Sequence, residues 1–87
     1  MDVHARLKKA REELVVLEEQ LAALSEEADD ARLRALVSEA RGADREHRDA
    51  QKHADAMARS RTAVMATIAE LESTQNRLLD QLVPGSA

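Results

Sequence analysis

Apolar residues recur along this chain at alternating spacings of three and four, in two separate blocks. In the first block the repeat runs through Val3, Leu7, Ala10, Leu14, Leu17, Leu21, Leu24, Ala28, Ala31, Ala35 and Ser38. In the second block it runs through His47, Ala50, Ala54, Met57, Arg61, Val64, Ile68, Leu71, Gln75, Leu78 and Leu82. A 3.5-residue period kept over five heptads is typical of a coiled-coil seam. The pattern therefore predicts two long helices, each with one packing stripe.

The few glycine and proline residues indicate where these helices begin and end. Gly42 suits the left-handed residue just past a helix end, and Asp44 suits the N-cap of a following helix. Pro84 then stops the second helix. We predict one domain over residues 1–83, with helices over about 2–41 and 44–83, a turn at 41–44 and a tail at 84–87.

Folding the chain back at Gly42 brings the two stripes together. Val3 then faces Leu82, Leu7 faces Leu78, Leu17 faces Ile68, and Ala35 faces Ala50. This match predicts an all-α, antiparallel two-helix coiled-coil hairpin. The alternative is a parallel dimer of extended helices, which makes less use of the matched stripes and of the capping residues.

Composition narrows the function classes further. The chain has no aromatic residue and no cysteine, so neither a β-sandwich nor a disulfide framework is expected. A net charge of −4 argues against binding along a phosphate backbone. No segment has the length of a membrane span, and the start lacks the features of a signal peptide. We expect a cytoplasmic protein, and the excess of Arg over Lys together with the abundant Ala indicates a GC-rich, bacterial genome.

A hairpin of this size buries only one narrow seam, which seldom outweighs the entropy of the chain. The second helix is weakly charged between Ala54 and Ala69, as in a helix with more than one neighbour. We therefore predict a homodimer that forms a four-helix bundle. The alternative is a solvated, alanine-rich hairpin. The candidate dimer-interface residues are Ala58, Met65, Ile68 and Leu79.

Three polar residues, His47, Arg61 and Gln75, interrupt the second stripe at intervals of fourteen. Such residues commonly fix register at some expense of stability, and this is the role we predict for them. Arg61 would face Leu24 and pair with Glu27, whereas an anion-binding role for Arg61 is the alternative. No catalytic set, phosphate loop or four-ligand metal set is present, so we expect no enzyme activity, no cofactor and no metal.

A second apolar set lies off the stripe near the predicted turn. It consists of Leu33, Leu36, Val37 and Ala40, at helical spacing. Exposed apolar stripes mark partner surfaces, so this set is our candidate protein-interaction surface. A local shift of the seam would instead turn it inward. The pair Val15–Val16 is a second apolar site opposite the seam.

Residues Glu70, Thr74, Arg77 and Gln81 follow the spacing Glu-x3-Ser-x2-Arg-x3-Gln-x3-Asp, with Thr74 in place of Ser and Gly85 in place of Asp. This motif resembles that of small actinobacterial anti-sigma factors, which are antiparallel two-helix coiled coils that bind cyclic di-GMP. The likeness covers twelve residues and has no copy in the first helix. It implies a ligand-responsive regulator, with these four residues as ligand contacts. Our main hypothesis is a protein-interaction adaptor or regulator, and a nucleic-acid-binding helix pair is a further alternative.

Overall fold

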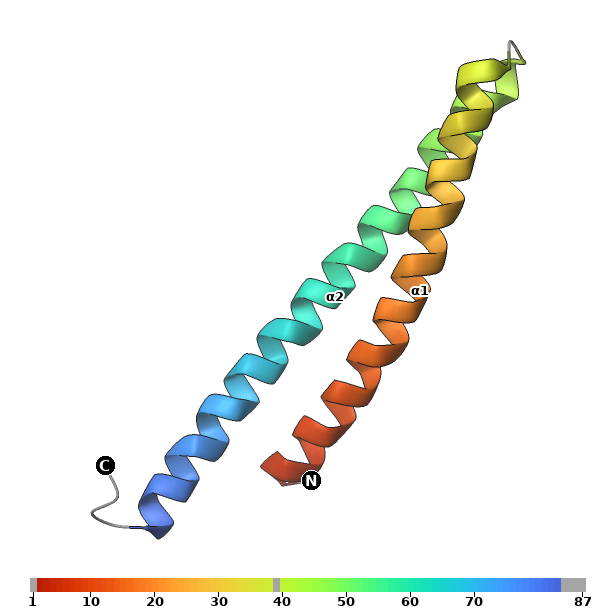
Figure 1. The fold of residues 1–87 in the computed structure, drawn as a ribbon. Coiled ribbons are helices and arrows are strands. Elements are labelled where there is room, and N and C mark those ends of the chain that lie inside the picture. Colours follow the sequence, from red (N-terminus) through yellow and green to blue (C-terminus); the bar gives the residue numbers. More distant parts are fainter. Residues whose placement is uncertain (1, 39, 84–87) are drawn as a thin grey trace.

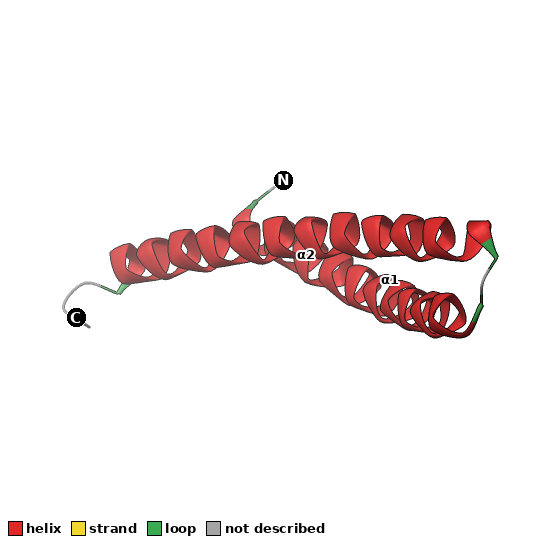
Figure 2. Cartoon of the chain, turned by 90° about the horizontal axis from the view of Figure 1, so that it is seen from above, coloured by secondary structure: helices red, strands yellow, loops and turns green. Residues whose placement is uncertain are grey.

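The chain forms two long helices that lie side by side in opposite directions (Figure 1). The computed structural model describes residues 2–38 and 40–83. Helix α1 spans Val3–Val37 and helix α2 spans Arg41–Leu82, and the described residues include no strand. The molecule measures 69 × 22 × 13 Å, and Figure 2 shows the two helices crossing each other. The predicted all-α helical hairpin is confirmed.

The ends of α1 are fixed by polar groups on either side of the helix. The Asp2 carboxylate accepts a hydrogen bond from the Ala5 N–H at 2.7 Å, which satisfies an amide at the start of the helix. At the other end Ser38 has an extended backbone, and its N–H donates to the Arg34 carbonyl at 3.0 Å. The Ser38 hydroxyl oxygen accepts from the Ala40 N–H at 3.1 Å. This local bond favours a chain reversal directly after Ser38.

The predicted turn at 41–44 is therefore wrong, because the connection runs from Ser38 to Ala40. Ala40 is the N-cap of α2 and forms no side-chain capping bond, while Asp44 lies in the first turn of the helix. Gly42 is helical rather than left-handed. The predicted helix stop at Pro84 and the tail at 84–87 lie outside the described residues.

The two predicted stripes form the contact between the helices. The buried residues of the described chain are Leu7, Ala10, Ala28, Ala31, Ala54 and Ile68, and all six belong to the stripes. The remaining stripe positions are half-buried, except that Ser38, Leu78 and Leu82 are exposed. The 3.5-residue period thus identified the packed face of both helices correctly.

The register differs from the predicted one by a full heptad. Ile68 packs in a cluster with Leu7 and Ala10, whereas folding at Gly42 would have placed it against Leu17. Leu14, Val64 and Leu71 pack against the same cluster. The cause is the earlier connection: moving the turn toward the N-terminus by three to four residues moves every pairing by seven.

One consequence is that α2 extends beyond the start of α1. It has 42 residues against 35 in α1, and seven residues add roughly 10 Å of helix at 1.5 Å each. Figure 1 shows the C-terminal end of α2 projecting past the N-terminal end of α1. Leu78 and Leu82, which were predicted to pack on Leu7 and Val3, lie in this projecting part and are 44% and 77% exposed.

Candidate interaction surfaces

The polar stripe residue Arg61 forms an ion pair across the hairpin. Its Nη2 and Nε atoms lie 3.2 and 3.3 Å from Oε1 of Glu18, and both side chains are only partly exposed. The predicted partner was Glu27, and this prediction is wrong because the shifted register places Arg61 beside an earlier part of α1, where Glu18 lies within reach. Since the guanidinium already has an acidic partner, Arg61 does not present an uncompensated charge to an anion.

The other two polar stripe residues, His47 and Gln75, are both half-buried at the helix contact. His47 lies in the second turn of α2, near the connection, and Gln75 lies close to the end of the part of α2 that α1 covers. Neither residue has a buried polar side-chain atom that lacks a hydrogen-bond partner. Their positions agree with the predicted place in the seam, and their role in fixing the register stays a prediction.

A second ion pair defines one side of the hairpin. Nη2 of Arg11 on α1 lies 3.6 Å from Oε1 of Glu72 on α2. Residues seven apart share a helix face, so Glu18 lies on the same side as Arg11, and Met65 on the same side as Glu72. We call this side the ion-pair face. It comprises Lys8, Arg11, Val15, Glu18, Ala22, Asp29, Ala58, Met65, Glu72 and Leu79.

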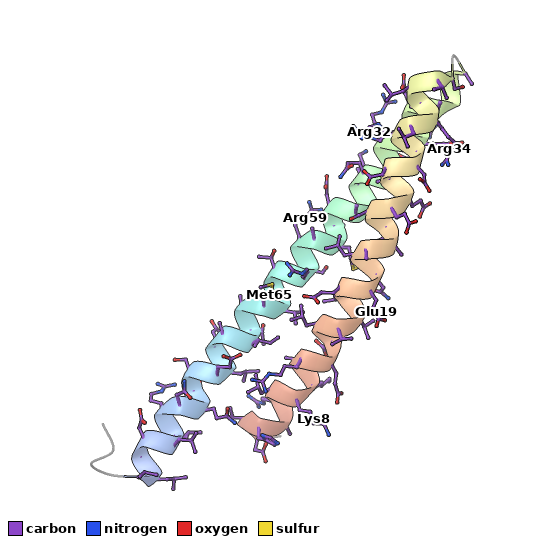
Figure 3. All side chains as sticks on the ribbon, in the orientation of Figure 1. Lys8, Glu19, Arg32, Arg34, Arg59 and Met65 are labelled. Carbon is purple, nitrogen blue, oxygen red and sulfur yellow. The ribbon has the colours of Figure 1, made fainter. Side chains whose placement is uncertain are left out.

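Three of the four candidate dimer-interface residues lie on this face. Met65 and Leu79 are 44% and 51% exposed, and Ala58 is half-buried. Ile68 does not join them, because it is only 9% exposed and packs inside the hairpin against Leu7 and Ala10. In Figure 3, Met65 on α2 and Lys8 on α1 project away from the contact between the helices.

The candidate protein-interaction surface lies at the tip of the hairpin and is open. Leu33, Leu36 and Val37 are 55%, 74% and 86% exposed, and Ala40 is exposed as well. The alternative in which the seam shifts and turns these residues inward is therefore not what the structure adopts. A shallow hollow of about 350 Å³ adjoins them, lined by residues that include Val37, Ala40 and Gly42. We call Leu33, Leu36, Val37 and Ala40 the tip surface.

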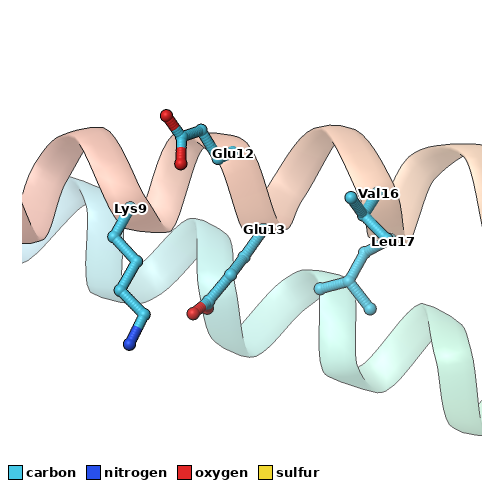
Figure 4. Close-up of a pocket in the computed structure, with 5 residues that line it drawn as sticks. All are labelled: Lys9, Glu12, Glu13, Val16 and Leu17. Atoms are coloured by element: carbon cyan, nitrogen blue, oxygen red, sulfur yellow. The ribbon is translucent and has the colours of Figure 1, made fainter.

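The Val15–Val16 pair also lies on the outside of α1, 56% and 51% exposed. Val16 lines an open hollow of about 560 Å³ with Lys9, Glu12, Glu13 and Leu17. Figure 4 shows that Lys9, Glu13 and Leu17 extend toward α2, whereas Glu12 and Val16 project to the other side. Because these side chains do not converge on a common point, the hollow is helix surface rather than a pocket for a small ligand.

The four residues that match the motif of the anti-sigma factors lie on one exposed side of α2. Glu70, Thr74 and Arg77 line a shallow hollow of about 630 Å³, and Nη2 of Arg77 donates to the Thr74 hydroxyl at 3.3 Å. Gln81 follows one turn later in the part of α2 that projects beyond α1. The structure thus brings three of the four residues together.

Sequence reasoning missed both cross-hairpin ion pairs and the projecting end of α2. Opposite charges at positions flanking the two stripes were the available signal, but they identify a pair only once the register is known. Within residues 2–38 and 40–83 no three metal-binding side chains cluster, and no helix there has the length and apolarity needed to cross a membrane. Searches of family models, curated proteins and solved structures find no match to this chain.

Proposed function

We propose that this chain is a non-enzymatic protein–protein interaction module, a small coiled-coil adaptor or regulator that works in the cytoplasm. The observation that carries the proposal is the tip surface. Its large residues Leu33, Leu36 and Val37 form one continuous helical stripe, are more than half exposed, and lie next to the connection where a partner has access. An apolar stripe of this kind is what a groove or helix of another protein covers.

The proposal includes self-association of two hairpins into a four-helix bundle. Six of the described residues are buried, and four of these are alanines, so the hairpin has a small core of its own. A core this small contributes little stability by itself, and oligomerisation is one way to bury more apolar surface. The exposed Met65 and Leu79 on α2 are the residues that such a bundle would cover.

The tip surface is tested by replacing Leu36→Ser and Val37→Ser together. Both side chains already face solvent, so we expect unchanged helicity and a Tm within about 3 °C of the parent protein. Capture of partner proteins by the tagged chain should be lost. The matched control is Val16→Ser with Ala23→Ser, two exposed positions in the middle of α1, and this variant should capture the same proteins as the parent.

Either of two results contradicts the proposal. Early melting of the tip variant would place these side chains in a core, and retained capture by a folded tip variant would place the interface elsewhere. A ligand-responsive regulator and a nucleic-acid-binding helix pair are the alternative functions. For the former, the shared face of Glu70, Thr74 and Arg77 is the structural support, but α1 carries no second copy of the motif.

A further inference from the structure

On the ion-pair face, α1 carries a row of residues whose charges are complementary to those of an identical row that runs in the opposite direction. Lys8, Val15, Ala22 and Asp29 follow each other at intervals of seven, so the row reads basic, apolar, small and acidic. All four side chains are exposed. The row lies beside Arg11 and Glu18, at a spacing of three residues, and therefore on the side marked by the two ion pairs.

The centre of this row falls between residues 18 and 19. Lys8 and Asp29 are equally far from that point, and so are Val15 and Ala22. A two-fold axis there, perpendicular to α1, places Lys8 opposite Asp29 of the second copy and Val15 opposite Ala22 of the second copy. Each contact then occurs twice, as a closed symmetric interface requires.

The same axis pairs residues of α2. The Arg61–Glu18 ion pair shows that the centre of the α1 row is level with residues near 60 on α2. Arg48 and Glu72 are equally far from residue 60, so Glu72 would meet Arg48 of the second copy. Close to the axis lie Ala58 and Thr62, which are small, and the Thr62 hydroxyl is already bonded to the Ala58 carbonyl at 3.1 Å.

We propose that two copies of this chain pack through the ion-pair face with their hairpins antiparallel, about a two-fold axis beside residues 18 and 19 of α1. This inference rests on the proposed self-association and specifies its face and orientation. Glu18 lies at the axis, where Arg61 of its own chain offsets its charge. The helices α1 of the two copies overlap over roughly 46 Å at 1.5 Å per residue, a length sufficient for an interface of standard size.

The opposite side of the hairpin provides the control. The same order of charges recurs one residue further along the chain, in Lys9, Val16, Ala23 and Asp30. This second row lies more than a quarter turn of the helix away from the row of Arg11 and Glu18. On this opposite side, the described residues of α2 include no exposed apolar side chain as large as Met65 or Leu79. Ser60 and Thr67 lie there instead, and their hydroxyls donate to carbonyls of the same helix. Charge reversals at neighbouring residues therefore discriminate between the two faces.

The experiment measures the dimer dissociation constant by sedimentation equilibrium at about 50 mM salt, where surface charges are weakly screened. Lys8→Glu and Asp29→Lys should each weaken the dimer about tenfold, because each reversal turns two symmetric attractions into repulsions. The double variant K8E/D29K restores both pairs and should return to the parent value. Lys9→Glu, Asp30→Lys and their double variant should change it less than twofold, and circular dichroism confirms that all variants stay helical.

Three results overturn the inference. A dimer that responds to the Lys9 and Asp30 variants but not to those at Lys8 and Asp29 uses the other face. If the dissociation constant changes with neither set of variants, or if K8E/D29K stays weakened, the two copies pack in a different orientation. In that case the proposed self-association still holds. A wild-type chain that is monomeric at every concentration removes both this inference and the four-helix bundle, but leaves the tip surface to its own test.

Discussion

At the scale of single residues, the connection between the helices is determined by Ser38 rather than by Gly42. Ser38 adopts an extended backbone, and its hydroxyl accepts the Ala40 N–H, so the chain reverses there. Glycine adopts the left-handed conformation more readily than other residues, so Gly42 suggested a left-handed helix end. In the structure it is an ordinary position of the first turn of α2, and apart from its chain neighbours and the backbone of its own helix, nothing lies within 4 Å of where a Cβ would stand.

The substitution Gly42→Ala tests this placement. Alanine is favoured over glycine in a helix by about 1 kcal/mol, and somewhat less at a helix end, so the variant should melt about 3–6 °C higher. Thermal unfolding followed by circular dichroism measures the change. Ala56→Gly, at an exposed interior position of α2, serves as a calibration and should lower the Tm by a similar amount. A lower Tm for Gly42→Ala would mean that Gly42 has the left-handed conformation after all.

At the scale of the helices, the heptad pattern predicted the packed stripes but not how they are aligned. A shift of seven residues places stripe on stripe again, so Ile68 finds an apolar neighbour in either Leu17 or Ala10. Periodicity therefore leaves the registers indistinguishable, and the position of the turn decides between them. The partner of Arg61 and the exposure of Leu82 follow from the register, and the sequence alone could not determine either. The phase of the repeat placed the tip surface outside the seam, but a local shift of the seam near the turn would have turned it inward, and only the structure decides for exposure.

The register can be tested by comparing two leucines at stripe positions. Leu7→Ala removes a side chain that is 1% exposed and should lower the free energy of unfolding by about 2–5 kcal/mol. Leu82→Ala, at a position 77% exposed beyond the start of α1, should change it by less than about 0.5 kcal/mol. Urea unfolding at the same protein concentration gives both values. Comparable losses for the two variants would support the alignment about Gly42.

At the scale of the whole molecule, the hairpin exposes a large area for its mass. Its accessible surface is 6760 Å², whereas a compact monomer of 9.6 kDa exposes about 5,100 Å². The extended shape, 69 Å long and 13 Å thick, explains the difference. A molecule of this form offers helix surface on every side, which suits the proposed role of binding other proteins, the first of them a second copy of itself.

Sedimentation equilibrium of the wild-type chain tests this central claim most directly. We expect a mass near twice 9.6 kDa at micromolar concentration, falling toward the single-chain mass on dilution. A stable, fully helical species of 9.6 kDa at every concentration up to the millimolar range would contradict it.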